Sequence, residues 1–292
     1  MIYRLCTFFL FASLCACSTT PTETNGETNS LRILVVNDDG IQSPGLSALA
    51  LALSDVGEVV VCAPSGNRSG ASHSSVAFSE TLIVNEIQME GANYACSISG
   101  TPSDATSFGI LHLGAENNFD LVVSGINRGA NVGKIAHYSG TVGAAMEGNY
   151  HGIPSIAVSQ ESRMKDFTAT AQWAARFARA LLKEGADPNI CWSINAPQKP
   201  KDGWLGAKLA PMGGGYIQVT GFRKMKPSKD GPETADGFRA AFNFKGQYPE
   251  GSDTEAYLQG WITIAPLRFN WTEESLLNES WIPDTNQVRV SD

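Results

Sequence analysis

Basic residues are scarce in this chain, and that shortage limits what it can bind. Of 292 residues, 21 are Lys or Arg and 29 are Asp or Glu, which gives a formal net charge of −8. This balance excludes a basic footprint for duplex nucleic acid, so we expect any bound nucleotide to be small or held through a metal. Hydrophobic residues make up 42% and charged residues 17% of the sequence, which is typical of a globular protein rather than a disordered one.

The apolar run at the N-terminus is too short for a good membrane span, which needs about 20 residues. It follows Arg4 and ends at Leu14-Cys15-Ala16-Cys17, which resembles a bacterial lipobox. We therefore expect residues 1–16 to be a lipoprotein-type signal peptide, Cys17 to be lipidated, and residues 17–30 to be a flexible tether. Export would place the protein on the periplasmic side as a lipoprotein. An ordinary secretory signal or a short hydrophobic anchor is the alternative, and an unused leader would leave the protein cytoplasmic.

Cysteine is also sparse for an exported protein. Cys6 and Cys15 would leave with the signal peptide, and Cys17 would carry the lipid. Three cysteines remain, an odd number, so the sequence implies no disulfide framework. Cys62 and Cys96 stand in strand-like surroundings, where we expect buried small hydrophobic side chains rather than nucleophiles.

Strand-like and helix-like segments alternate from residue 31 onward, which predicts an α/β fold with a parallel, doubly wound sheet and helices on both faces. The first unit is an apolar run that ends at Val36, an acidic turn, and a helix that follows Ser43-Pro44. The sequence predicts further strands at 58–64, 82–89, 94–99, 120–125, 156–159 and 260–267, and helices at 45–53, 101–113, within 139–148 and at 167–183.

The alternation of strand-like and helix-like segments ends after Pro197. Gly213-Gly-Gly215, the Lys- and Pro-bearing stretch 223–233 and the segment 238–244 suggest long loops and a hairpin rather than another strand–helix unit. We therefore expect residues 31–292 to form a single domain in which residues 198–258 are an extension that serves as an oligomerisation arm.

Two adjacent carboxylates, Asp38 and Asp39, follow the first predicted strand directly. In open α/β sheets the ligand crevice lies beyond the carboxyl ends of the strands. Neighbouring carboxylates repel each other unless a cation or a proton separates them, so a divalent metal is the simplest explanation. The alternative is an ordinary Asp-Asp-Gly turn in which an aspartate caps the following helix.

Three more polar elements follow predicted strands or precede helices: Asn67-Arg68-Ser69, Ser124-Gly-Ile-Asn127 and Ser139-Gly140-Thr141. The Ser69 hydroxyl and the Asn127 carbonyl would add neutral oxygens to the two carboxylates, and an all-oxygen set suits Mg²⁺, Mn²⁺ or Ca²⁺ better than zinc. A Ser-Gly-Thr sequence at a helix start offers backbone N–H groups and hydroxyls to a phosphate. Together these elements indicate phosphoester hydrolysis.

Five ordered sequence blocks resemble the signatures of the SurE survival-protein family, and a sixth resembles its C-terminal block. The resemblance covers roughly residues 31 to 270. The blocks are Leu34-Val-Val-Asn-Asp-Asp-Gly40, Ala63-Pro-Ser-Gly-Asn-Arg-Ser-Gly-Ala-Ser72, Gly100-Thr-Pro-Ser-Asp104, Ser124-Gly-Ile-Asn-Arg-Gly-Ala-Asn131, Tyr138-Ser-Gly-Thr-Val142, and Gly251-Ser-Asp-Thr-Glu-Ala with Gly260-Trp-Ile-Thr-Ile-Ala-Pro-Leu267.

This resemblance implies a metal-dependent phosphomonoesterase that acts on nucleoside 5'- and 3'-monophosphates. It also implies a Rossmann-like, three-layer core and an arm that joins subunits into homodimers or homotetramers. Each subunit would hold one divalent ion, Mn²⁺ or Mg²⁺, with Ca²⁺ as a further candidate. By motif, the metal ligands are Asp38, Asp39, Ser69 and Asn127, the phosphate loop is Ser139, Gly140 and Thr141, and Asn37 joins the two aspartates in the catalytic set.

Some positions leave alternatives open. Arg68 flanks a ligand position, so it either contacts substrate or is a solvated loop arginine. The chain departs from the family pattern at Val36, at Lys134 and after Ala210, which bears on substrate preference and assembly. A second hypothesis is therefore a non-catalytic, metal-dependent nucleotide-binding lipoprotein. A Rossmann cofactor enzyme is disfavoured, because carboxylates replace the glycine-rich loop at the first turn.

Overall fold

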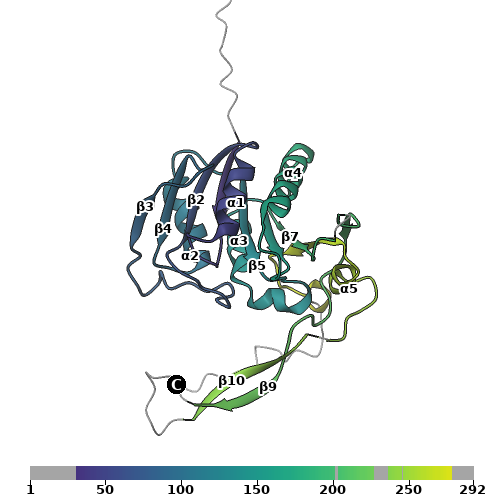
Figure 1. Cartoon of the computed structure of the whole chain (residues 1–292). Coiled ribbons are helices and arrows are strands. Elements are labelled where there is room, and N and C mark those ends of the chain that lie inside the picture. The colour runs from purple at the N-terminus through teal and green to yellow at the C-terminus, as the bar shows by residue number, and fades with distance from the viewer. Residues whose placement is uncertain (1–30, 201–202, 227–235, 245, 278–292) are drawn as a thin grey trace, which may run out of the picture.

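The central feature of the molecule is one large sheet (Figure 1). The computed structural model describes residues 31–200, 203–226, 236–244 and 246–277. The expected signal peptide, the lipidation site at Cys17 and the tether lie outside these ranges. Within them, no helix combines the length and the apolar character needed to cross a membrane.

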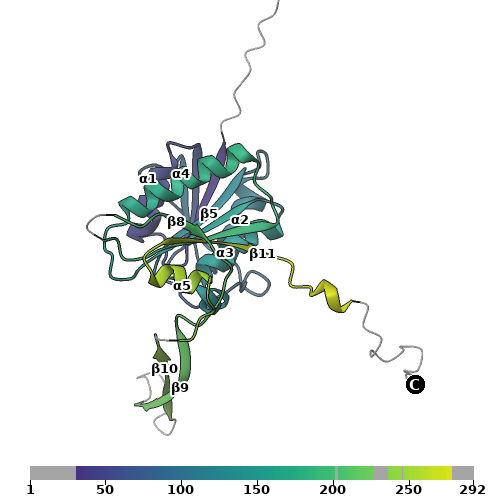
Figure 2. The same cartoon turned by 90° about the vertical axis from the view of Figure 1, so that its right-hand side faces the viewer.

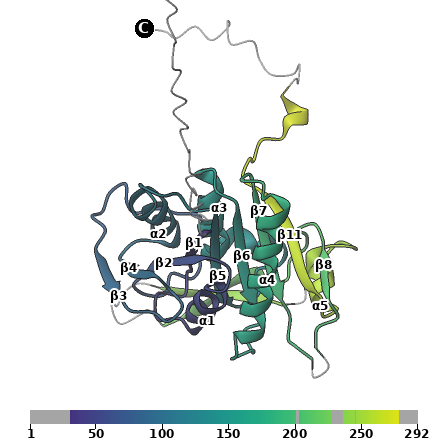
Figure 3. The same ribbon diagram turned by 90° about the horizontal axis from the view of Figure 1, so that it is seen from above.

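In the described part of the chain, nine strands join in the order β3-β4-β2-β1-β5-β6-β7-β11-β8. The six strands from β4 to β7 run parallel, and the edge strand β3 and the pair β11 and β8 run against them. Viewed from above, the order runs from β3 at one edge to β8 at the other (Figure 3). The strands are β1 (Arg32–Val36), β2 (Glu58–Pro64), β3 (Val84–Ile87), β4 (Tyr94–Ile98), β5 (Leu121–Arg128), β6 (Ser155–Gln160), β7 (Ile190–Ala196), β8 (Ala207–Leu209) and β11 (Ile262–Arg268).

Helices cover both faces of the sheet. Helices α1 (Pro44–Leu53) and α4 (Thr168–Glu184) pack together on one face, and α2 (Pro102–Phe108) and α3 (Gly140–Tyr150) pack together on the other. Alternate residues of β1 enter the two cores: Ile33 and Val35 pack with α1 and α4, and Leu34 and Val36 face the α2 side. The predicted three-layer, mostly parallel α/β fold is confirmed.

The structure differs from the predicted elements at several boundaries. β3 is shorter than the predicted strand at 82–89, and the helix predicted at 101–113 ends at Phe108 and continues as a π-helical turn (Gly109–Leu113). Several elements have no counterpart among the predicted ones: β7, β8, helix α5 (Asp253–Leu258), and the 3₁₀ helices Gly133–Tyr138 and Glu274–Leu276. Within the predicted extension 198–258, β8 joins the main sheet and α5 packs on β11.

A two-stranded hairpin projects from the main body (Figures 1 and 2). It consists of β9 (Gln218–Met225) and β10 (Gly237–Asn243), paired antiparallel in a sheet of their own. Phe242 lies opposite Val219 and Ala240 opposite Phe222, so one hairpin face is lined with apolar side chains. Hence the hairpin predicted from the sequence is present, and it is the part of the extension that stands apart from the sheet.

Candidate active site

The acidic turn lies where the strand order reverses. β1 pairs with β2 on one side and with β5 on the other, and such a switch point is where open α/β sheets place their ligands. The Asn37 amide braces the turn: Nδ2 donates to the Gly40 carbonyl at 2.9 Å, and Oδ1 accepts from the Gly40 N–H at 3.2 Å. Gly40 has φ +96°, and a Cβ there would lie 2.9 Å from the carbonyl carbon of Gly66. The Asn37 side chain, predicted in the catalytic set, thus fixes the direction of the two carboxylates.

Asp38 is a buried carboxylate that lies beside the first turn of helix α3. Its side chain is 3% exposed, and Oδ1 accepts a hydrogen bond from Thr141 Oγ1 at 2.6 Å. Burial raises the pKa of Asp38 to about 6, aided by the adjacent charge of Asp39 and opposed by the hydrogen bond from Thr141. A Cβ on Gly140 would lie 2.8 Å from Asp38 Cβ, so only glycine permits this approach.

Asp39 is held by neutral donors from two other loops. Asn67 Nδ2 lies 3.3 Å from Oδ1, and the backbone N–H of Arg128 donates to Oδ2 at 3.1 Å. These contacts bring the loop after β2 and the end of β5 to the acidic turn. The acidic turn therefore contacts two of the other three polar elements identified in the sequence, and Thr141 brings the third into contact through Asp38.

The loop after β2 carries Ser69 and Arg68. The Arg68 N–H donates to the Asp38 carbonyl at 2.7 Å, and the Ser69 N–H donates to Asn67 Oδ1 at 2.9 Å. Ser69 is exposed, so its hydroxyl is accessible beside the acidic turn. The Arg68 guanidinium reaches the Ser99 carbonyl at 2.9 Å, where it anchors this loop to the end of β4.

A β-bulge presents Asn127. The pairing of β5 with β6 shifts by one residue between Ser124 and Asn127, and bulges beside active sites re-aim side chains in this way. Asn127 Nδ2 donates to the Gly129 carbonyl at 2.8 Å, which leaves the amide oxygen free of that contact. The bulge was not predicted, although Gly125 within a strand pattern is a signal for one.

Ser139 begins helix α3 as its N-cap. Its hydroxyl accepts from the Val142 N–H at 3.2 Å, so this predicted phosphate contact already serves the helix. The first turn still offers backbone N–H groups and the positive end of the helix dipole. Because Asp38 contacts Gly140 and Thr141, the acidic turn and the N-terminus of α3 are direct neighbours.

The donors at this site fit a hard cation. Neither Asp38 nor Asp39 forms an ion pair with any residue in the described ranges. The flanking guanidinium groups point to backbone carbonyls instead, Arg68 to Ser99 and Arg128 to Ser162. No group of three or more His, Cys, Asp or Glu in the described chain could hold a metal, so a cation here would need the neutral oxygens of Ser69 and Asn127, as an oxygen-only site allows.

A second polar chain, not foreseen from the sequence, fixes the far end of the Ser69 loop. His73 Nε2 lies 2.6 Å from Glu147 Oε2, and His151 Nε2 lies 3.1 Å from the other oxygen of Glu147. Ser107 Oγ lies 3.1 Å from His151 Nε2. The His73 imidazole is therefore turned along helix α3, toward its second turn. Nothing in the pattern around Glu147 distinguishes it from an ordinary helix carboxylate.

Three known proteins resemble this chain along nearly their whole length. Residues 33–218 match the family described as survival protein SurE. The 5'-nucleotidase SurE of Rhodopirellula baltica is 34% identical over 251 residues, or 85% of this chain and 97% of that protein. The 5'-nucleotidase SurE 1 of Thermus thermophilus is 36% identical over 251 residues, or 85% and 95%. The crystal structure of the SurE protein from Aquifex aeolicus matches with a TM-score of 0.70 at 34% identity, covering 84% of this chain and 96% of that one.

Proposed function

The chain belongs to the SurE survival-protein family, and on that premise we propose that it is a metal-dependent 5'-nucleotidase that also accepts nucleoside 3'-monophosphates. Its products are a nucleoside and inorganic phosphate. The observation that carries the proposal is the 2.6 Å hydrogen bond between Thr141 Oγ1 and Asp38 Oδ1. This hydrogen bond links two carboxylates to the N-terminus of a helix. The carboxylates have no cationic side chain as partner in the described ranges, and a helix N-terminus is suited to an anion.

The residues that would hold the metal are Asp38, Asp39, Ser69 and Asn127. When bound, a Mn²⁺ or Mg²⁺ ion would polarise the phosphoryl group and lower the pKa of a water molecule. Ca²⁺ is a further candidate, because it takes the same oxygen ligands. The raised pKa of Asp38 supports this assignment, since a buried carboxylate without a partner cation favours its protonated form.

The chain's own groups account for the remaining steps. The N–H groups of Gly140 and Thr141 bind phosphate oxygens and stabilise the charge that develops on them. Asn67 and the Arg128 N–H hold Asp39, and Thr141 holds Asp38. Water adds to phosphorus as the ester P–O bond breaks; one of the two aspartates accepts a proton of that water, and the leaving nucleoside oxygen takes up a proton from solvent water.

Phosphate release from nucleoside 5'- and 3'-monophosphates tests this function, with Mn²⁺, Mg²⁺ or a chelator added. We expect phosphate release that depends on the metal and that is abolished in Asp39→Asn. Asp55→Asn is the matched control, because Asp55 is an exposed aspartate outside the site, and it should leave release unchanged. Turnover that survives in Asp39→Asn would contradict the assignment of the site. Silence of the wild-type protein on every nucleotide, with metal still bound, would instead favour the non-catalytic nucleotide-binding lipoprotein.

We further propose that the hairpin joins subunits into a homodimer or homotetramer. Its apolar face exposes Phe222 by 70%, Phe238 by 61% and Phe242 by 51%. Two strands alone are marginally stable in water, so a second hairpin packed on this face would supply the missing burial. The lipobox-like leader supports a proposal that the mature protein is exported and held at the membrane by a lipid on Cys17.

A further inference from the structure

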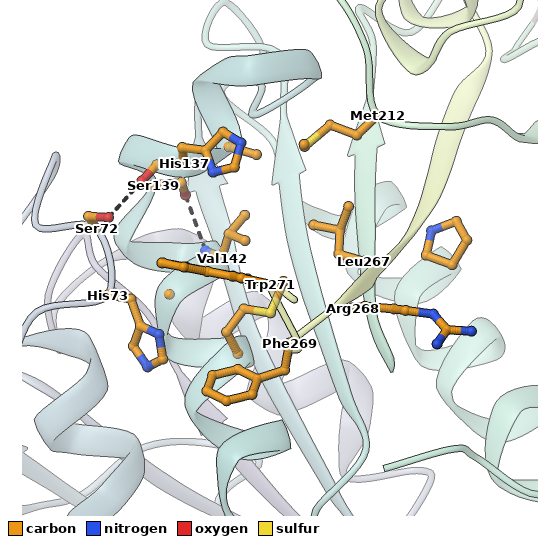
Figure 4. A pocket seen from close by; sticks show the side chains of 14 residues that line it. Ser72, His73, His137, Ser139, Val142, Met212, Leu267, Arg268, Phe269 and Trp271 are labelled. Atoms are coloured by element: carbon orange, nitrogen blue, oxygen red, sulfur yellow. Dashed lines mark hydrogen bonds between the residues drawn. The ribbon is translucent and has the colours of Figure 1, made fainter. Parts of the chain in front are cut away.

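The segments that supply the proposed metal ligands are held in place by contacts with their neighbours. Ser72 Oγ, on the loop that carries Ser69, donates to the His137 carbonyl at 2.6 Å, a contact drawn as a dashed line in Figure 4. Asn127, the other neutral oxygen ligand, lies instead at the bulged end of β5. The side chains that hold this end of β5 therefore bear on the geometry of the site.

The segment after Asn127 is covered by two tyrosines. Ala130 and Val132 are buried in a small apolar cluster with Tyr257, and Tyr216 packs against the same cluster. Tyr257 lies on α5, and Tyr216 shortly precedes β9, so both tyrosines belong to the extension that follows Pro197. The two rings meet edge to face, with their centroids 5.3 Å apart. The extension thus packs directly on the chain that presents Asn127.

Both tyrosine hydroxyls donate to one buried carboxylate. Glu161, directly after β6, is 7% exposed, and its Oε2 accepts from Tyr257 at 3.1 Å and from Tyr216 at 3.5 Å. Burial acts to raise the pKa of Glu161, but hydrogen bonds from Arg163 and Ser162 outweigh it and hold the pKa below its ordinary value. Burial and the charge of Glu161 raise the pKa of Tyr257, so its hydroxyl keeps the proton that it donates.

The other oxygen of Glu161 continues this polar chain to the acidic turn. Oε1 accepts from Ser162 Oγ at 3.1 Å, and the Ser162 carbonyl accepts from Arg128 Nε at 3.3 Å. The backbone N–H of Arg128 in turn donates to Asp39 Oδ2 at 3.1 Å. A continuous series of hydrogen-bonded residues thus runs from α5 to a carboxylate of the site.

Resting on the function proposed above, we infer that Glu161 and Tyr257 are positioning residues for the metal site. They contact neither metal nor substrate, and they fix the end of β5, which supplies Asn127 and holds Asp39 through the N–H of Arg128. Residues that orient metal ligands from behind typically change metal affinity or activity by about 10- to 100-fold when they are lost. The two residues therefore act on metal affinity rather than on substrate binding.

Mn²⁺ binding tests this inference without turnover. The full-length protein is titrated with Mn²⁺, and the electron paramagnetic resonance signal of the free ion gives Kd. Glu161→Ala should raise Kd roughly tenfold, and Tyr257→Phe, which keeps the ring and removes only the hydroxyl, should raise it by a smaller factor. Glu58→Ala is the matched control, because Glu58 accepts from Arg32 Nε at 3.0 Å where β1 and β2 begin, at the end of the sheet opposite the acidic turn. It should lose stability in urea unfolding without a change in Kd.

Hydrolysis of a nucleoside 5'-monophosphate gives the second readout. Both variants should need more Mn²⁺ for half-maximal rate, whereas KM for the nucleotide at saturating Mn²⁺ should stay close to that of wild type. A merely structural role would not produce this split. If Glu161→Ala does not fold, Tyr257→Phe decides the matter alone.

The inference is overturned if the folded variants bind Mn²⁺ as tightly as wild type, if Glu58→Ala weakens binding equally, or if the wild-type protein binds no Mn²⁺. It is also overturned if KM for the nucleotide rises while the Mn²⁺ requirement does not. If the wild-type protein binds Mn²⁺ but hydrolyses no nucleotide, the proposed function fails, and the titration still decides the roles of Glu161 and Tyr257.

Discussion

Thr141 joins the acidic turn to helix α3 through one side-chain hydrogen bond. Both residues are buried, with Thr141 fully enclosed and Asp38 3% exposed. A hydrogen bond to a charged group contributes more than one between neutral groups. Loss of the hydroxyl would therefore remove both stability and the constraint on the direction of the carboxylate.

We expect Thr141→Val to lower kcat at least tenfold and to lower the free energy of unfolding by about 2 kcal/mol, the range for a hydrogen bond to a charged group. Steady-state kinetics and urea unfolding would measure the two effects. Thr106→Val is the matched control, because Thr106 is equally buried and donates to the Ala144 carbonyl at 3.1 Å. It should lose stability without a comparable loss of kcat; equal kinetic losses in both variants would contradict a specific role for Thr141.

Gly140 is the second residue on which the site geometry depends. A methyl group there would lie 2.8 Å from Asp38 Cβ and 3.1 Å from Oδ2. Gly140→Ala should displace the carboxylate and reduce kcat by roughly 100-fold, as misplacement by about 1 Å can do. Gly66→Ala, in the neighbouring loop, meets no atom within 4 Å and should retain activity in the same assay. Full activity of Gly140→Ala would show that the turn and the helix do not need this close approach.

At the scale of elements, the segment between β2 and α2 connects the site to the helix layer. Asp104, at the start of α2, accepts from the N–H groups of Thr101 at 2.9 Å and Val76 at 3.0 Å, and from Ser75 Oγ at 2.5 Å. One carboxylate thus caps the helix and holds the segment that begins with the Ser69 loop. Burial acts to raise the pKa of Asp104, but these hydrogen bonds outweigh it and hold the pKa below its ordinary value.

Asp104→Asn should therefore destabilise the fold, by about 2 kcal/mol at pH 7. Because the folded-state pKa of Asp104 lies below its unfolded value, its contribution is complete above about pH 4 and is lost as the pH falls through the folded-state value. Urea midpoints should differ clearly between wild type and variant at pH 7, and the difference should shrink as the pH falls below about 4. A difference that stays constant with pH would mean that the charge of Asp104 is not what stabilises the segment.

The elements that the sequence predicts are those with strong local patterns. β1 and β2 are continuous apolar runs, and α4 has a clear amphipathic repeat. β8 spans three residues, too few for a periodicity, and its place beside β11 depends on contacts between distant segments. The predicted boundary also failed at α2, where Gly109 directly follows Phe108 as the C-cap but keeps a helical φ of −55°, so the chain continues into the π-helical turn instead of leaving the helix.

For site residues too, local sequence patterns predict positions but not contacts between distant segments. The strand that ends at Val36 places Asp38 and Asp39 at the sheet edge, and the Ser-Gly-Thr motif places Thr141 at a helix start, so these positions follow from local pattern. Where a long side chain points does not: the Arg68 guanidinium reaches the Ser99 carbonyl across 31 residues of sequence. Nor does the pattern show that Glu147 holds His73.

On the scale of the whole molecule, the hairpin stands apart from the sheet that carries the candidate site. It forms its own two-stranded sheet and projects away from the main body (Figure 2). Its apolar face is not part of the two large cores that surround the central sheet. Changes on that face should therefore alter how subunits associate and leave the folded core intact.

Replacement of Phe222, Phe238 and Phe242 by Ser should lower the oligomeric state, as measured by sedimentation velocity, and should leave the unfolding midpoint of the isolated subunit close to that of wild type. Phe78→Ser is the control, since Phe78 is 95% exposed on the main body and should not affect assembly. An unchanged sedimentation coefficient in the triple variant would contradict the hairpin as the contact between subunits.

The buried thiols give this molecule an internal reporter of its own opening. Cys62, Cys96 and Cys191 form no disulfide and are fully buried, and burial raises the pKa of Cys191 to about 12, so little thiolate forms at Cys191 while the fold is closed. Cys62 and Cys96 lie side by side on β2 and β4, and Cys191 lies on β7 across the sheet. A thiol reagent applied to the protein from residue 31 onward would thus label the two halves of the sheet at rates set by their separate opening equilibria. If added metal or nucleotide slows labelling of one half more than that of the other, the difference would reveal which half that ligand stabilises.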